Sequence, residues 1–441
     1  METQGKVLNL VYDVWDDVND KPIANCSDTL GDIDFRYENG FIDFYERFYK
    51  AQLNTDRNSI PRTFNKIEEV WKRPNENFYY FIKTSLHIRV MLLDRGLKFS
   101  SIVKDCLKNC KNLFVCILCE HESDDVHGYR ILLHSLSEWG LPQEQFILLN
   151  NNFLMDTYAE KYNSKIKTHR LDLLALTSCS IFSHNKIPFI PNKEGKLFIC
   201  HNRGQKPHRY GILSLIRNGG FLDNVNWSYV SGNKKNKDEI WHLSEVMELE
   251  MVEKIREHIE YFYSIDVKKS DYEINRKDFI GHDVVADISD LPPLSGAAME
   301  SGGYMLPEYG LTYQNSYINI VNESVWKDDD DVVHITEKSF RPFNFYNMPI
   351  FVATKHHVKF LKETYGFDLF EDLIDHSYDN EPDIKKRLMM VYDEIKRLND
   401  NKENVIKFYS ENQYRFEKNR EIICNIPNND NDLKFLQSLM S

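Results

Sequence analysis

Apolar residues follow strand and helix spacings in the first half of the chain. KVLNLVYDV at 6–14 alternates as a strand does, and NLFVCILC from Asn112 is a continuous apolar run typical of a buried strand. GYRILLHSLSEWG then has helical spacing closed by a glycine, and QFILLN forms a further strand run. The strand, helix, strand order predicts a βαβ unit in a parallel sheet, with functional side chains at Glu120–His127 and Asn150–Asn152.

The second half repeats this pattern. LFIC at 197–200 predicts a strand, and HNRGQKPHR is a loop before the helix YGILSLIRN, in whose first turn Pro207 is tolerated. Residues 317–353 read as strand, acidic loop, short helix and strand, with Val332–Ile335 as an additional strand. Because proline breaks a helix interior, Pro342 places the start of the short helix near Ser339 and leaves Lys338 at its mouth.

These elements predict two α/β domains joined by a linker. The proline-containing segment 184–196 is the expected linker, and 262–316 is expected to be an ordered loop region or lid. Residues 41–53, 384–398 and 405–423 favour helices, the last a single one. We predict two Rossmann-like domains facing each other, at 1–190 and 191–400, with a C-terminal helix and tail at 401–441 able to cross back over the first.

The composition of the chain indicates where the protein is located and which classes of partner it does not bind. The chain has 441 residues with 55 Lys and Arg against 68 Asp and Glu, a net charge of −13 that opposes non-specific attachment to nucleic acid or anionic membranes. Its eight irregularly spaced cysteines indicate reduced, buried thiols rather than a zinc site. Since no apolar run approaches the roughly 18 residues that cross a bilayer, we expect a cytoplasmic protein with no membrane contact and no obligatory protein partner.

Basic residues surround the start of the helix that follows LFIC. Arg203 lies in the preceding loop, and His208 and Arg209 lie in the first turn. A helix N-terminus offers free N–H groups and a partial positive charge, so a neighbouring guanidinium completes a diphosphate site. The alternative is that these residues are solvated loop cations.

Glu337 and Lys338 suggest the other half of such a site. A carboxylate can accept two hydroxyls of a ribose or hexose, and an adjacent ammonium can neutralise a phosphate. Both interactions are needed to bind a nucleotide sugar. The neighbouring run Asp328–Asp331 could bind Mg²⁺ or Mn²⁺ but is more typical of a solvated turn, so we predict no metal.

The two motifs together resemble a known family. NES at 322–324 followed by HITEKSFRPFNFYNMPIFV resembles the nucleotide-sugar motif of the α-1,3-fucosyltransferases, and still more the divergent glycosyltransferases of large phages and viruses. HNRGQKPHRYGILSLI resembles the arginine loop that binds phosphate in that family. The likeness covers roughly residues 197–375.

The resemblance implies a GT-B fold, a donor held mainly by the C-terminal domain, and no required cofactor. It places Arg203 and Lys338 on the diphosphate of a UDP- or GDP-sugar, Glu337 on its ribose or sugar, and Glu323 as the residue that orients the pocket. His334, at a position where the family tends to have tyrosine, and Thr336 belong to the same donor motif.

The acceptor side is expected in the N-terminal half. An inverting transfer needs a base for the acceptor hydroxyl, and Glu120 or Glu122 after the buried strand is our candidate, although a retaining mechanism stays open. The acceptor is a glycan or, if the protein is viral and works in the host cytoplasm, a hydroxymethylated pyrimidine in phage DNA. The alternative function is a non-catalytic nucleotide- or carbohydrate-binding protein of the same fold.

Overall fold

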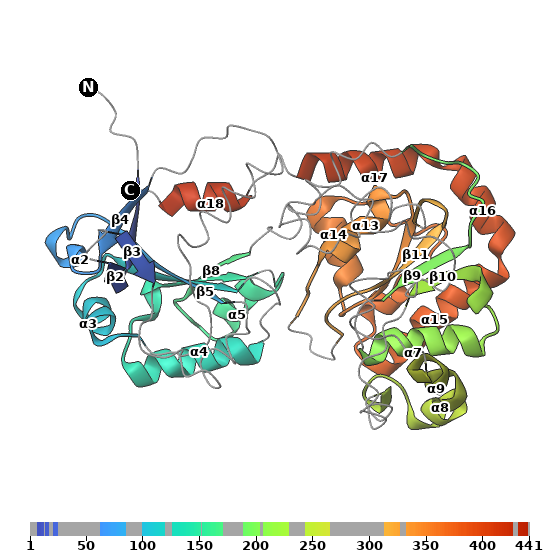
Figure 1. The fold of residues 1–441 in the computed structure, drawn as a ribbon, viewed down its shortest axis with the longest axis horizontal. Helices are drawn as coiled ribbons and strands as arrows, with labels where there is room; N and C mark the ends of the chain where they lie inside the picture. Colours follow the sequence, from blue (N-terminus) through green and yellow to red (C-terminus); the bar gives the residue numbers. More distant parts are fainter. Residues whose placement is uncertain are drawn as a thin grey trace. The chain divides into compact units, whose positions relative to one another are not determined.

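A computed structural model describes most of the chain, which folds into two compact units (Figure 1). The described residues are 7–12, 14–16, 21–24, 62–84, 99–119, 126–150, 152–170, 188–202, 206–228, 243–264, 313–326, 332–426 and 431–439. Unit 1 comprises Met1–Leu176, Asp331–His334 and Asn429–Ser441, and unit 2 comprises Thr177–Asp330 and Ile335–Asn428. Both units are α/β structures built on parallel sheets, as the sequence predicts.

Unit 1 is built on a six-stranded parallel sheet with the order β4-β1-β5-β6-β7-β8. Its strands are β1 (Leu8–Tyr12), β4 (Arg62–Lys66), β5 (Phe78–Thr84), β6 (Leu113–Cys119), β7 (Phe146–Asn150) and β8 (Lys167–Arg170). A short antiparallel hairpin is formed by β2 (Val14–Asp16) and β3 (Lys21–Ala24). The predicted strand at the N-terminus and the predicted βαβ unit are confirmed.

Helices cover the unit 1 sheet because the strands β5, β6 and β7 present apolar side chains to both faces. The helices are α2 (Glu69–Lys72), α3 (Ser101–Asn109), α4 (Val126–Trp139), the 3₁₀ turn η2 (Gln143–Gln145), α5 (Met155–Lys161) and α18 (Asn431–Leu439). The main core packs α2, α3, α4 and α5 against alternate residues of the strands, among them Leu148. His169 pairs with Leu149, which points to the opposite face, and there its ring stacks on Phe435 of α18 at 4.1 Å.

Unit 2 has a four-stranded parallel sheet with the order β10-β9-β11-β12. Its strands are β9 (Phe198–His201), β10 (Val225–Ser228), β11 (Ile318–Asn322) and β12 (Met348–Val352). Its helices are α7 (Pro207–Asn218), η3 (Leu222–Asn224), α8 (Leu249–Lys254), α9 (Arg256–Ser264), α13 (Glu337–Asn344), α14 (His357–Tyr365), η7 (Ser377–Asn380), α15 (Ile384–Asp400), α16 (Lys402–Glu411) and α17 (Gln413–Asn425). Pro207 occupies the first position of α7, as predicted.

Three predictions about local structure are wrong. Val332–Ile335 is not a strand: the division between the units falls after His334, whose only ladder contact among the described residues is an isolated bridge to Asn152. Helix α13 begins at Glu337 rather than near Ser339, because the Thr336 side chain caps its N-terminus. Pro342 lies in the second turn of the helix, where its missing N–H removes one backbone hydrogen bond. The expected last helix at 405–423 is two helices that meet at Asn412.

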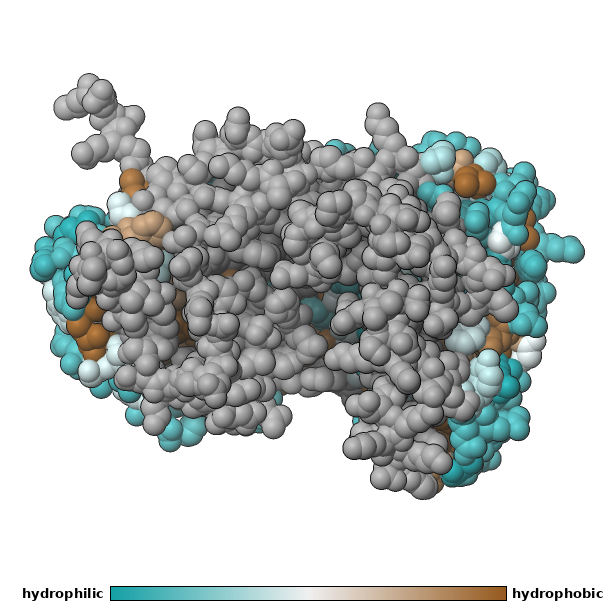
Figure 2. Space-filling model, in the orientation of Figure 1, coloured by the Kyte–Doolittle hydropathy of each residue, from teal (hydrophilic) through white to brown (hydrophobic). Residues whose placement is uncertain are grey.

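The coloured surface in Figure 2 is mainly hydrophilic, with small and separate hydrophobic areas. Among the described residues the large apolar side chains left exposed are Phe64, Trp71, Leu249, Tyr261 and Tyr414. Scattered residues of this kind are normal on protein surfaces. No helix in the described ranges is both long and apolar enough to span a membrane.

Candidate functional site

The strand order of unit 2 marks one place on its sheet for ligand binding. The chain passes from β9 to β10 on one side and then returns to β11 and β12 on the other. In open parallel sheets, ligands bind at the carboxyl ends of the strands where the order reverses in this way. The reversal lies between the end of β9 at His201 and the end of β11 at Asn322, and α7 and α13 begin in the segments that follow.

Glu323 is the fixed point of this edge. Its side chain is fully buried, and the two oxygens of its carboxylate accept four hydrogen bonds. The Oε1 atom accepts from the Thr336 amide at 3.2 Å and from the Ser339 hydroxyl. The Oε2 atom accepts from the Ser324 amide at 3.0 Å and from the Thr336 hydroxyl at 2.7 Å. Each oxygen accepts two of these four hydrogen bonds, so the Glu323 carboxylate holds the surrounding segments of the edge in place.

Helix α13 starts on this carboxylate and presents Lys338 and Glu337. The Thr336 hydroxyl accepts from the Lys338 amide as the N-cap and also from the Lys338 ammonium, both at 3.3 Å. The ammonium also donates to the Ser324 hydroxyl at 3.3 Å and to the Glu337 carboxylate at 2.7 Å. Lys338 and Glu337 keep 27% and 26% of their side-chain surface exposed, so both remain accessible to a ligand.

The Glu337 carboxylate is held in its ionised form. Burial opposes ionisation, but the neighbouring Lys338 and Arg341 cations outweigh it and lower the pKa of Glu337 to about 2. An ionised carboxylate only accepts hydrogen bonds. Glu337 is therefore able to receive hydroxyl donors across the whole physiological pH range.

Helix α7 approaches the same edge from the end of β9. The Lys206 ammonium donates to the Ser324 carbonyl at 2.5 Å. The His208 ring donates from Nε2 to the Glu323 carbonyl at 3.0 Å, and Arg209 donates to the same oxygen at 3.3 Å. Burial, reinforced by the Arg209 charge, holds the pKa of His208 well below its usual value, so this ring is neutral.

A second layer of buried residues supports Glu323. The Ser339 hydroxyl lies 2.8 Å from Nε2 of His357, and both side chains are fully buried. His357 begins α14 directly after β12. The Asp379 carboxylate caps that helix by accepting from the Val358 and Lys359 amides at 3.0 and 3.1 Å. Ser339 of α13 contacts the Glu323 carboxylate directly, and His357 of α14 reaches it through Ser339.

Most of the predicted donor residues with a described position gather at this edge. His208, Arg209, Glu323, Thr336, Glu337 and Lys338 belong to unit 2 and lie at the ends of β9 and β11 or at the starts of the following helices. His334 instead belongs to unit 1, where it is 1% exposed and bridges Asn152. Arg203, Glu120, Glu122 and the Asp328–Asp331 run lie outside the described residues.

Sequence reasoning did not identify Lys206, Ser339, Arg341 and His357. Lys206 immediately precedes Pro207, which marks a helix start, so its place at that start was readable from the sequence. Ser339 and His357 carry no such signal, because they reach Glu323 only through the packing of α13 and α14.

The described residues of the edge carry a surplus of positive charge. Among them, four cations lie around the carboxylates of Glu323 and Glu337: Lys206, Arg209, Lys338 and Arg341. Arg341 is 8% exposed and donates to the Tyr313 hydroxyl at 2.9 Å. Cations beside two helix N-termini favour an anionic ligand, such as a phosphate or diphosphate.

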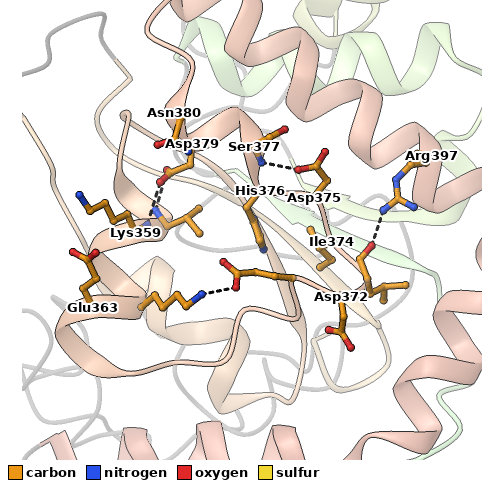
Figure 3. A pocket seen from close by; sticks show the side chains of 14 residues that line it. Lys359, Glu363, Asp372, Ile374, Asp375, His376, Ser377, Asp379, Asn380 and Arg397 are labelled. Atoms are coloured by element: carbon orange, nitrogen blue, oxygen red, sulfur yellow. Dashed lines mark hydrogen bonds and ion pairs between the residues drawn. The ribbon is translucent and has the colours of Figure 1, made fainter.

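A second hollow in unit 2 has a different character. Figure 3 shows this pocket of ≈ 740 Å³, which lies between α14, the segment 371–380 and α15. Several of its charged groups already have partners: Lys362 pairs with Glu371, Asp375 accepts from the Ser377 amide, and Asp379 caps α14. None of the donor residues predicted from the sequence lines it.

Comparisons with other proteins add no identification. Among the described residues, no group of three or more His, Cys, Asp or Glu side chains is placed to hold a metal ion. No protein-family model matches this chain, and no curated protein matches it either. The geometry of the unit 2 edge is therefore the main indication of function.

Proposed function

We propose that this protein is a glycosyltransferase that uses a nucleotide-sugar donor, with the GT-B arrangement of a donor domain in unit 2 and an acceptor domain in unit 1. The observation that supports this most is the meeting of Lys206, Lys338 and the ionised Glu337 at the strand reversal of the unit 2 sheet. The ammonium groups suit a diphosphate, and Glu337 suits the hydroxyls of a ribose or sugar.

The proposed reaction transfers the sugar from the diphosphate to an acceptor hydroxyl. Negative charge develops on the leaving diphosphate as its bond to the sugar breaks. Lys338 stabilises that charge together with Arg203, which precedes α7 in the sequence. Glu120 or Glu122 removes the proton from the acceptor hydroxyl in an inverting transfer. The donor is a UDP- or GDP-sugar, and the acceptor is a glycan or a hydroxymethylated pyrimidine of phage DNA.

Nucleoside diphosphates test the donor site directly. We expect UDP or GDP to raise the melting temperature of the protein, since a ligand at about 100 times its Kd adds about 2.7 kcal/mol to the free energy of unfolding. Lys338→Ala should remove most of this shift. Lys362→Ala is the matched control, because that lysine is 53% exposed and pairs with Glu371 away from the site.

The outcomes separate transfer from simple binding. No stabilisation by any nucleoside diphosphate, or equal shifts for Lys338→Ala and Lys362→Ala, would refute the proposed donor site. Binding that is followed by release of sugar from the donor supports a transferase, and loss of that release in Glu120→Gln or Glu122→Gln identifies the base. Binding without any turnover over a panel of UDP- and GDP-sugars would favour a non-catalytic binding protein.

A further inference from the structure

A buried hydrogen-bonded chain runs from the start of α14 to the end of β11. It links His357, Ser339 and Glu323, each of which is fully buried. The Ser339 hydroxyl contacts His357 Nε2 at 2.8 Å on one side and the Glu323 carboxylate on the other. Three polar side chains buried together in this way require mutual satisfaction, because an unmatched buried polar group is costly.

The direction of the hydrogen bonds follows from the single proton of Ser339. An ionised Glu323 carboxylate only accepts, so Ser339 donates to it. The Ser339 oxygen then accepts from His357 Nε2–H, which sets the position of the proton on that ring. The chain therefore has one defined polarity, from His357 through Ser339 to Glu323.

The same carboxylate sets the position of Lys338. Its Oε2 atom accepts from the Thr336 hydroxyl, and that hydroxyl accepts in turn from the amide and the ammonium of Lys338. Its Oε1 atom, which receives Ser339, also receives the Thr336 amide. The first turn of α13 is thus hydrogen-bonded to the Glu323 carboxylate. Ser339 contacts this carboxylate directly, and His357 in turn contacts Ser339, so the two residues fix its orientation.

We propose that His357 and Ser339 are positioning residues of the donor site, which act through Glu323 and Thr336 to hold the Lys338 ammonium at the end of β11. This inference rests on the proposed function for its ligand, a diphosphate. Neither residue contacts the ligand, since both are fully buried. A preorganised cation binds an anion more tightly than a mobile one, because less conformational entropy is lost on binding.

Binding of UDP and of inorganic pyrophosphate to the full chain measures this effect. Ser339→Ala should raise the Kd of both ligands roughly tenfold, the equivalent of one hydrogen bond to a charged group. Ser339→Thr keeps the hydroxyl and should restore the affinity. His357→Leu should weaken binding, and His357→Gln, which keeps a donor, should weaken it less.

Ser214→Ala is the matched control. Ser214 is a fully buried serine of α7 whose hydroxyl has no hydrogen-bond partner among the residues that the structure describes, so its removal should leave the Kd unchanged. A Ser339→Ala variant that binds both ligands as the wild type does overturns the proposal. So does an equal loss of affinity in Ser339→Ala and Ser339→Thr.

Amide hydrogen exchange tests the positioning without any ligand. In Ser339→Ala, exchange should accelerate at the amides of Ser324 and Thr336, which donate to Glu323, and not in strands β9 and β12. If wild-type protein binds neither UDP nor pyrophosphate, the proposed function fails while this local acceleration still supports the positioning role. Unchanged exchange, or the same acceleration throughout the unit 2 sheet, overturns it.

Discussion

Replacing Glu323 by glutamine removes a buried charge and keeps the shape of the side chain. Each carboxylate oxygen accepts one backbone amide and one hydroxyl. An NH₂ group in place of either oxygen allows the hydroxyl to turn and accept, but the amide of Ser324 or Thr336 then faces another donor. A buried N–H without an acceptor costs about 1–3 kcal/mol, and the bonds that remain lose their charge assistance.

We therefore expect Glu323→Gln to lower the free energy of unfolding of unit 2 by about 3 kcal/mol. The measurement is urea unfolding followed by hydrogen exchange of unit 2 peptides, because a chain with two units need not unfold in one step. Glu363→Gln, an exposed glutamate of α14, is the control and should change stability by less than about 0.5 kcal/mol.

A Glu323→Gln variant as stable as the control would contradict this expectation. A stable Glu323→Gln variant that had lost only nucleotide binding would mean that the carboxylate contacts the ligand itself. That result would contradict the four internal donors described above.

Two further predictions concern charged residues elsewhere in unit 2. Burial raises the pKa of Asp379 from 3.8 to about 6, so the folded state binds more protons between these pH values and stability should fall, by up to ~3 kcal/mol, as pH rises. Asp379→Asn should abolish that slope in urea titrations. Arg415 pairs with Asp368 and Asp372, so Arg415→Ala should lose about 1–2 kcal/mol and Arg415→Lys regain only part of it. The exposed Lys407 at 3.9 Å from Glu411 is the control: a Lys407→Ala variant as damaging as Arg415→Ala would contradict this.

The predicted residues at the edge of the unit 2 sheet fall into a partly exposed group and a buried group. Lys338 and Glu337 are partly exposed, whereas Glu323, His208 and Arg209 are buried. The buried residues hold the backbone and the side chains of the edge in place. Substitutions of the buried group should therefore change stability and affinity together, and substitutions of the exposed pair should change affinity alone.

Periodicity in the sequence determined the regular elements of both units. The runs at 113–119 and 146–150 became strands and the segment at 126–139 became a helix, because each buries enough apolar surface for its local pattern to fix its structure. Proline and glycine marked the limits of α7, since Pro207 fits a first turn and Gly219 and Gly220 follow the last. These features depend only on residues that are close together in the sequence, so they can be predicted from the sequence alone.

Tertiary structure alone decided how the site is assembled. Val332, Val333 and Ile335 have strand propensity, yet the chain changes units after His334 and no strand forms. Helix α13 begins at Glu337 because Glu323 receives the Thr336 amide and hydroxyl, and that contact joins residues 13 positions apart. Ser339 and His357 became part of the site in the same way. Hydrogen bonds between distant segments depend on the packing of whole elements, which no local pattern contains.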